Sequence, residues 1–383
     1  MSSKSKHSDA PIIADTLSNV DDSTATTSPD RTLEADRSES TGFDLTNTGI
    51  TSVVEERTAK ALDPRVKRSL VLATLRQPVF SITNFSSLLK DVIRFSADRS
   101  ITTLDILLFT TDEVSHVWAG FSSDAFLQVQ KTISELYIET ARISRELKSN
   151  LETTIIFADW SGYDLAKEDL DWAVVGVNTI DRALADNFLN VHQGHYKDRI
   201  NPVVIESSAT ITRESTTTSL DNPPRIYNVV AVGGTFDHLH AGHKILLTMT
   251  AWLAQGKVVC GITGDALLVN KKHKEVMENI VVRTQHVDEF YHRLKRGITY
   301  ELVPIEDVAG PTGTDPTIQA LIASRETEAG SAQIREIRQN KNLPPLDILF
   351  IDVIGPEGEV HGAQMAELKL SSTAIRQRLA SKI

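Results

Sequence analysis

The sequence is short of cysteine, because only Cys260 is present among its 383 residues. An intramolecular disulfide and a metal site built on paired cysteines are therefore excluded. Cys260 lies in the apolar run KVVCGIT, where we expect a small core side chain. A chain without disulfides suits a reducing compartment, so we expect the cytoplasm, with the nucleus as an alternative.

Long hydrophobic runs and an excess of basic residues are also missing. No apolar run approaches the ~20 residues that a membrane helix needs, and the N-terminus has no apolar signal core. The 40 Lys and Arg residues are outnumbered by 51 Asp and Glu, which gives a net charge of −11. We therefore predict no membrane span and no broad surface for nucleic acid, although a local basic pocket for phosphates stays open.

The start of the chain has few apolar and aromatic residues. Residues 1–62 are rich in Ser and Thr and are acidic overall, so they cannot bury enough apolar surface to offset the entropy of ordering. We predict a disordered tail there. A second polar stretch, 206–225, ends in a double proline that favours extended backbone, and we interpret it as a linker.

Between these stretches, residues 63–205 have an α/β pattern. The short apolar runs SLVLATL, LDILLF, TTIIFADW and WAVVGV have strand length, and a stretch at 122–150 has helical periodicity. Strands that alternate with helices indicate a parallel layer structure. No phosphate loop, metal spacing or nucleophile motif appears in this domain, so its role stays open.

Residues 226–383 repeat the alternation with clearer punctuation. This pattern predicts one doubly wound, Rossmann-like domain with a parallel sheet, whose ligands bind beyond the carboxyl ends of the strands. We expect strands near 226–232, 257–263, 299–303, 317–323 and 346–352, and helices near 242–255, 280–296, 326–341 and 372–382.

The patterns GxGxxG and GxxxxGK[ST] are absent, but VVAVGGTFDHLHAGH at 229–243 places three of the 11 histidines within six positions after a predicted strand. Gly233 and Gly234 let backbone approach an anion, and the following helix N-terminus favours phosphate. His240, His243 and the Thr235 hydroxyl form a donor cluster suited to charge on a phosphoryl group. A glycine turn with surface histidines is the alternative, and no cysteine supports zinc.

A second constellation is KLSSTAIRQRL at 369–379. Ser371 and Ser372 are strong N-cap residues, and Arg376 follows one turn later. Hydroxyls, free backbone N–H groups and a guanidinium can therefore point toward one anion. An ordinary capped terminal helix is the alternative.

Taken together, GGTFDHLHAGH and LSSTAIR resemble the paired signatures of the HxGH nucleotidyltransferase superfamily. From residue 225 onward the chain is similar to phosphopantetheine adenylyltransferases of the eukaryotic and archaeal type, and to the adenylyltransferase half of bifunctional coenzyme A synthase. GPTGTDPT at 310–317 and SRET at 324–327 are further matches. The resemblance does not extend to the preceding domain.

This resemblance implies transfer of the adenylyl group of ATP to 4′-phosphopantetheine, giving dephospho-coenzyme A and pyrophosphate. Mg²⁺ is expected to enter with ATP, and we name no protein metal ligand. By motif, His243 is the main stabiliser of the transition state and His240 contacts the nucleotide phosphates. The implied substrate- and ATP-binding residues are Gly233, Gly234, Thr235, Phe236, Asp237 in an orienting place, Lys271 with Lys272 as its substitute, Arg325, and Ser371, Ser372, Thr373 and Arg376 on the β- and γ-phosphates.

Two alternatives remain open. One is another HxGH enzyme, such as a nicotinamide-mononucleotide adenylyltransferase or a cytidylyltransferase. The other is a scaffold subunit of a coenzyme A-making complex. Because no P-loop is present, we expect a separate dephospho-coenzyme A kinase, and other enzymes of that pathway are candidate partners. A fragment that begins near residue 222 is expected to keep the activity.

Overall fold

The computed structural model groups residues 63–383 into one compact unit. The predicted tail at 1–62 and all of the predicted linker except residue 225 lie outside the described residues. The described residues are 66–75, 82–161, 172–178, 181–183, 186–187, 201–205, 225–352, 354–355, 358–359 and 372–381.

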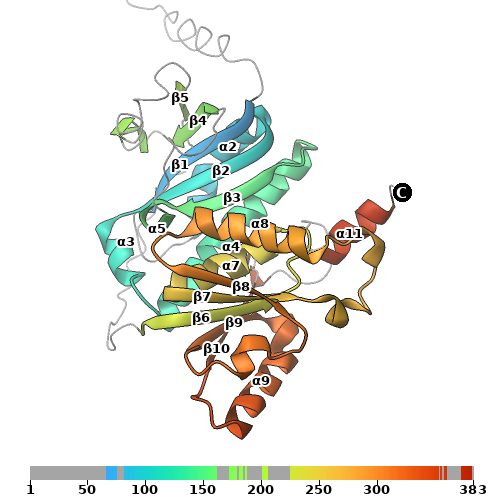
Figure 1. The fold of residues 1–383 in the computed structure, drawn as a ribbon. Coiled ribbons are helices and arrows are strands. Elements are labelled where there is room, and N and C mark those ends of the chain that lie inside the picture. Colours follow the sequence, from blue (N-terminus) through green and yellow to red (C-terminus); the bar gives the residue numbers. More distant parts are fainter. Residues whose placement is uncertain are drawn as a thin grey trace, which may run out of the picture. The chain divides into compact units, whose positions relative to one another are not determined.

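The N-terminal half of the compact unit forms a parallel sheet with strand order β3-β2-β1-β4-β5 (Figure 1). The predicted apolar runs form its strands, since a parallel strand that is buried on both faces needs continuous apolar sequence. The run TTIIFADW is a strand only as far as Phe157, because a short helix begins at Ala158. The elements are β1 (Val66–Leu75), α2 (Ile82–Arg99), β2 (Ser100–Thr110), α3 (Asp112–Val117), α4 (Ser123–Glu146), β3 (Glu152–Phe157), α5 (Ala158–Ser161), β4 (Trp172–Asn178) and β5 (Asn201–Ile205).

The C-terminal half forms a second parallel sheet with the order β10-β9-β6-β7-β8. Read from β8 to β10, the strands come in the chain order third-second-first-fourth-fifth, which is the order of the first sheet and of five of the six strands of the classic doubly wound fold. The α/β prediction for both halves is therefore confirmed. The elements are β6 (Tyr227–Gly234), α7 (Ala241–Leu253), β7 (Ala254–Thr263), η2 (Asp265–Leu268), η3 (Lys274–Val276), α8 (Ile280–Leu294), β8 (Thr299–Ile305), η4 (Gly310–Gly313), β9 (Ala320–Ser324), η5 (Arg325–Thr327), α9 (Glu328–Asn340), β10 (Asp347–Ile351), the hairpin β11 (Ile354–Gly355) and β12 (Gly358–Glu359), and α11 (Ser372–Ala380).

Helices cover both faces of this second sheet. Val230 and Val232 of β6 join the core under α7 and α8, whereas Val229 and Ala231 join a separate cluster that includes Ile334 of α9. Figure 1 accordingly shows α7 and α8 on one side of the sheet and α9 on the other. Alternate residues of one strand are thus buried in two different clusters, as a doubly wound sheet requires.

The two halves share one hydrophobic core. Residues 244–253 of α7 are all buried, since one side of the helix packs on its own sheet and the other meets the N-terminal half. The indole of Trp252 donates to the carbonyl oxygen of Trp118 at 3.0 Å and lies 6.4 Å from the Phe126 ring. A helix with apolar residues all round is usually buried on every side. The run KILLTMTAWL therefore indicates that α7 packs on a second partner besides its own sheet.

Among the residues that the structure describes, no helix combines the length and the apolar content needed to cross a bilayer.

The shared core bears on the stability of a fragment that begins at residue 222, whose activity stays a prediction. Removing the N-terminal half exposes the apolar side of α7, including Trp252, and uncovers the buried Lys244. We expect fragment 222–383 to unfold in urea at a clearly lower midpoint than the full chain, or without a cooperative transition. Fragment 63–383, which keeps both sheets, is the control and should keep the midpoint of the full chain. Equal midpoints for 222–383 and 63–383 would show that the halves fold independently.

Candidate active site

The predicted motif turn lies at the carboxyl end of the central strand. β6 ends at Gly234, and α7 begins at Ala241 with His240 as its N-cap residue. β6 has β7 on one side and β9 on the other, which makes this the point where the strand order reverses. Ligands of doubly wound sheets bind at such a point, and the free N–H groups of α7 face it.

The turn contains backbone strain. Phe236 and His238 have φ angles of 51° and 47°, a left-handed conformation that is unfavourable for side chains of this size. The Phe236 ring is fully buried beneath Gly234, where an added Cβ would lie 2.9 Å from the ring. Glycine is therefore required at residue 234, and the Phe236 side chain supports the turn from below. Such strain persists only where the surroundings enforce it, and it clusters at functional sites.

A buried arginine that the motifs did not reveal holds this turn. Arg283 of α8 is fully buried, and its Nη1 donates to the carbonyl oxygens of Thr235 at 2.7 Å and Thr263 at 2.9 Å. Its Nε donates to the carbonyl oxygen of Glu278 at 3.0 Å. Arg283 thus ties together the loops that follow β6 and β7. Its sequence context, VVRTQ, resembles an ordinary helix surface and gives no signal of this role.

The two predicted catalytic histidines lie against each other. Their rings are stacked with centroids 3.9 Å apart, and the His243 ring also meets the edge of Phe236 at 5.4 Å. The Nε2 atom of His240 lies 3.1 Å from the Ser372 hydroxyl. The Nδ1 atoms of both histidines are buried and have no hydrogen-bond partner in the described structure. Buried polar atoms normally have partners, so this pair is suited to a ligand that supplies them.

The surroundings keep both imidazoles neutral. Burial lowers the pKa of His243 to about 3, against the opposing effect of the Asp237 charge. Burial and then the neighbouring His243 hold the pKa of His240 well below its usual value. Each ring therefore offers one N–H donor and one bare nitrogen at neutral pH.

The C-terminal helix closes onto the motif turn, as the paired signatures predicted. Arg376 of α11 is buried and its Nη1 donates to the Asp237 carboxylate at 2.7 Å. The second oxygen of that carboxylate accepts from the backbone N–H of Glu278 at 2.9 Å. The Ser372 hydroxyl donates to the Asp237 carbonyl oxygen at 3.2 Å. Asp237 thus occupies an orienting place, and Arg376 is engaged with it rather than directed at open space.

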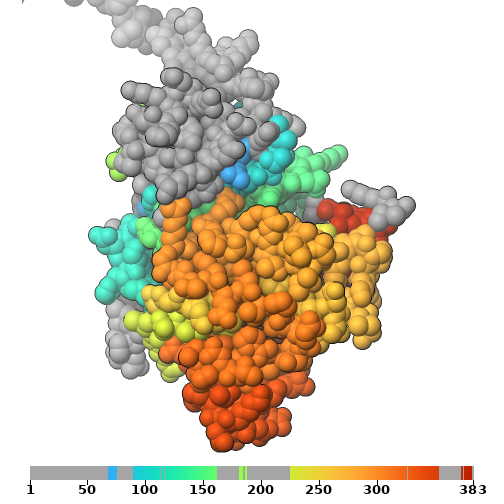
Figure 2. Space-filling model, in the orientation of Figure 1, coloured from blue at the N-terminus to red at the C-terminus, as the bar shows by residue number. Residues whose placement is uncertain are grey.

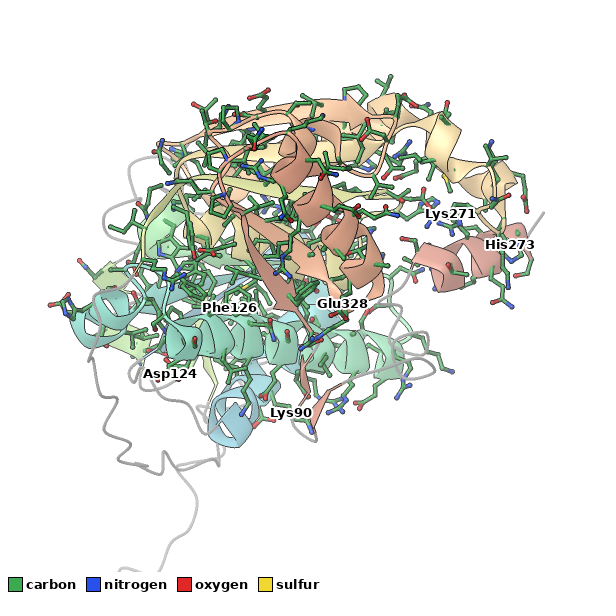
Figure 3. The ribbon with its side chains drawn as sticks, turned by 90° about the horizontal axis from the view of Figure 1, so that it is seen from below. Lys90, Asp124, Phe126, Lys271, His273 and Glu328 are labelled. Carbon is green, nitrogen blue, oxygen red and sulfur yellow. The ribbon has the colours of Figure 1, made fainter. Side chains whose placement is uncertain are left out.

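The segment that contains the predicted Lys271 and Lys272, here called the lysine segment, lies at the same site. The Nε atom of Arg376 donates to the carbonyl oxygen of Lys272 at 2.9 Å, which fixes this segment beside α11. Figure 3 shows Lys271 and His273 there, and in Figure 2 the red atoms of α11 lie against the segment that follows β7. Lys271 is exposed, and its charge contributes to the lowered pKa of His243. Lys271 can therefore face a phosphate beside that histidine.

The other predicted binding residues, Thr373, Arg325 and Ser371, lie in different surroundings. Thr373 is exposed, and its hydroxyl accepts from Nη2 of Arg376 at 3.3 Å. Arg325 follows β9 and its Nε pairs with Asp352 at 3.1 Å, beside the end of β10. Ser371 lies outside the described residues. The ligand contacts assigned to all of these residues stay predictions.

One cluster has the composition of a metal site. Ligand atoms of Asp237, His238 and Glu278 lie within 4.8 Å of one another. Both Asp237 oxygens are already used, one by Arg376, and a Glu278 oxygen accepts from the His238 backbone N–H at 2.8 Å. Mg²⁺ prefers oxygen ligands, and a neighbouring guanidinium opposes any cation. The cluster therefore fits a hydrogen-bonded support of the turn better than a magnesium site.

The N-terminal half also reaches α7. Lys244 follows His243 directly and is buried, with Nζ 3.0 Å from the Glu152 carboxylate and 2.8 Å from the Thr153 carbonyl oxygen. Arg293 of α8 similarly donates to the buried Asp105 of β2 at 2.6 Å. The first turn of α7 is thus anchored from outside its own domain, which no motif predicted.

Comparison with known proteins adds relatives to this geometry. Residues 231–378 match a family model described as Cytidylyltransferase-like. The chain is 44% identical over 155 residues to a phosphopantetheine adenylyltransferase of Saccharomyces cerevisiae, covering 40% of this chain and 50% of that protein, so it spans about half of that relative's length. It is 34% identical over 153 residues to a phosphopantetheine adenylyltransferase of Methanothermobacter thermautotrophicus, covering 40% of this chain and 85% of that protein.

A third relative shares more of the chain. An uncharacterized protein of Schizosaccharomyces pombe is 35% identical over 304 residues, which is 77% of this chain and 95% of that protein. Because residues 226–383 make up fewer than 304 residues, this match also includes much of the sequence before them. The N-terminal half is therefore a shared feature and belongs in any account of function.

The neutral state of His243 predicts how stability depends on pH. Its pKa is about 3 in the folded protein and 6.5 in an unfolded chain, so the unfolded state binds more protons between these values. The folded state therefore keeps its full stability above pH 6.5, where His243 is neutral in both states, and loses stability as the pH falls below this value. Between pH 7 and pH 5 we expect the wild type to lose about 2 kcal/mol more unfolding free energy than His243→Asn, measured by urea denaturation. Equal losses would contradict the buried neutral state.

Proposed function

The chain belongs to the phosphopantetheine adenylyltransferase family, and we propose that it transfers the adenylyl group of ATP to 4′-phosphopantetheine, forming dephospho-coenzyme A and pyrophosphate. The observation that carries this proposal is the pair of stacked, neutral histidines at the N-terminus of α7, each with a buried Nδ1 atom that has no partner among the described residues. Ser372 and Lys271 approach the same pair from two other segments.

The proposed reaction is a direct displacement. A phosphate oxygen of the acceptor attacks the α-phosphorus of ATP and forms the new P–O bond. The bond from the α-phosphorus to the bridging oxygen breaks, and its electron pair leaves with pyrophosphate. Such a reaction needs alignment and charge stabilisation rather than a covalent enzyme intermediate.

The chain's own groups suit these tasks. The N–H of a neutral imidazole donates to a phosphoryl oxygen as charge grows there, and the free N–H groups of α7 add a positive dipole end. Lys271 supplies a full positive charge at the exposed edge of the site. Since His240 and His243 hardly protonate at neutral pH, we assign donation to a phosphoryl oxygen to His243, positioning to His240, whose N–H is used on Ser372, and proton transfer to neither.

Mg²⁺ belongs to this proposal as the ion that accompanies ATP. We propose that the nucleotide phosphates hold it, because the Asp237, His238 and Glu278 cluster is already occupied by its own hydrogen bonds. A cytoplasmic location, and a separate dephospho-coenzyme A kinase among further partners of the same pathway, complete the proposal.

His243 is expected to dominate turnover. With ATP, Mg²⁺ and 4′-phosphopantetheine, we expect the wild-type chain to release pyrophosphate, and His243→Ala to lower kcat at least ~10²-fold, because a preorganised donor at the developing charge is removed. His292→Ala is the matched control, since His292 lies on the exposed side of α8 and should leave kcat unchanged.

Acceptor choice is tested in the same assay. Nicotinamide mononucleotide replaces 4′-phosphopantetheine in one arm, and CTP replaces ATP in another. Pyrophosphate release only in these arms would assign a different nucleotidyltransferase, and no release in any arm would favour a scaffold. Wild-type turnover in His243→Ala would refute the assigned role of that histidine.

A further inference from the structure

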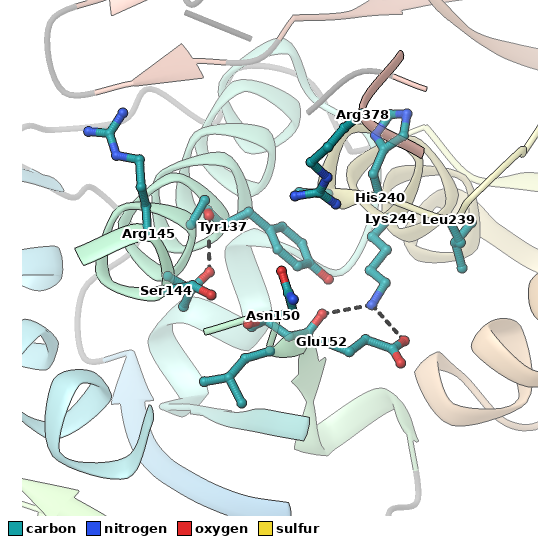
Figure 4. A pocket seen from close by; sticks show the side chains of 14 residues that line it. Tyr137, Ser144, Arg145, Asn150, Glu152, Leu239, His240, Lys244 and Arg378 are labelled. Carbon is teal, nitrogen blue, oxygen red and sulfur yellow. Dashed lines mark hydrogen bonds and ion pairs between the residues drawn. The ribbon is translucent and has the colours of Figure 1, made fainter. Parts of the chain in front are cut away.

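A cavity of about 250 Å³ lies where the two halves of the compact unit meet (Figure 4). Its walls come from α4 and β3 of the N-terminal half and from α7 and α11 of the C-terminal half. His240 is part of the wall, so the cavity adjoins the candidate active site. None of the motifs in the sequence points to this space, because most of its lining belongs to the domain without motifs.

The buried side chains of the lining offer hydrogen-bond donors. Lys244 uses two of its three N–H groups on Glu152 and Thr153. The Tyr137 hydroxyl accepts from the backbone N–H of Ile155 at 3.3 Å, which leaves its own proton for another acceptor. Burial raises the pKa of Tyr137 above its usual value, so this hydroxyl stays protonated.

Arg378 adds the strongest donor. It follows Arg376 by two residues on α11, and 100° per residue places the two side chains on opposite sides of the helix. Arg376 faces Asp237, whereas Figure 4 shows Arg378 reaching into the cavity toward Tyr137. Within the described structure, its guanidinium forms no hydrogen bond or ion pair with another residue.

The charges of the lining point to an anion. Three basic side chains, Arg145, Lys244 and Arg378, line the cavity with a single carboxylate, Glu152. Because Glu152 already pairs with Lys244, the positive charge of Arg378 remains. Guanidinium, ammonium and hydroxyl donors around one small cavity match the many acceptor oxygens of a phosphate group.

We propose that this cavity is a phosphate-binding site formed by both halves of the protein, with Arg378 as its main contact and Tyr137 as the contribution of the N-terminal half. The phosphate is supplied either by the polyphosphate chain of a nucleotide that passes His240 or by a separate phosphorylated compound. In both cases the N-terminal half has a direct role in ligand binding.

Titration calorimetry of the full chain with inorganic pyrophosphate tests this site without reference to turnover. We expect Arg378→Ala to raise the Kd at least ~10-fold, and Tyr137→Phe to raise it at least about 3-fold, because one hydrogen bond from a neutral donor to the phosphate is lost. Arg335→Ala is the matched control, because Arg335 is exposed on α9 at the far face of the second sheet, and its Kd should stay within about 2-fold. Urea denaturation checks that each variant is folded.

Each part of the proposal has its own contradicting result. An unchanged Kd in folded Arg378→Ala, or no binding to the wild type, overturns the site, and an unchanged Kd in folded Tyr137→Phe overturns its assignment to both halves. A repeat with saturating ATP identifies the source, since loss of the Arg378-dependent binding indicates the nucleotide's own phosphates and persistence indicates a separate compound. An inactive wild type that still binds pyrophosphate through Arg378 would refute the proposed reaction and keep the site.

Discussion

The buried ion pair between Asp237 and Arg376 is the contact on which the candidate site depends. It joins two segments 139 residues apart, and neither side chain is open to solvent. Removing one partner of such a pair typically costs about 3–5 kcal/mol, because the other charge stays buried without compensation. Asp237 sits between two residues with left-handed backbone, and Arg376 also fixes the lysine segment through Lys272. The strained turn around Asp237, the C-terminal helix α11 and the segment with Lys271 and Lys272 therefore form one assembly.

Burial of α7 from both sides extends this assembly to the N-terminal half. The helix has its own sheet on one side and Trp118 and Phe126 on the other, so its first turn cannot shift independently. Lys244 carries the contact to within one residue of His243. The domain that has no catalytic motif thus contributes through packing, ion pairs and the wall of a cavity. The same strand order in both sheets gives each half a central strand, but only the second has the histidine turn.

Much of this fold was predictable from the sequence, since buried parallel strands need apolar runs, and the predicted strands and helices of residues 226–383 match the observed ones closely. The meeting of the two motifs was also predictable. The partner of Arg376 was not, because spacing along a helix does not tell whether a guanidinium faces a carboxylate or a ligand. Nor was the role of Arg283, whose acceptors are backbone carbonyl oxygens and leave no mark on the sequence. The apolar sequence of α7 did indicate the shared core, but an interpretation that treats the two halves as separate domains misses it.

A double-mutant cycle between Asp237 and Arg376, measured as kcat/KM for pyrophosphate release, tests the central claim most directly. If the two segments close around one site, Asp237→Asn and Arg376→Gln disrupt the same assembly, and their effects should be coupled by at least about 1.5 kcal/mol. Effects that add to within about 0.5 kcal/mol would contradict the account, because they would show that the motif turn and the C-terminal helix act independently.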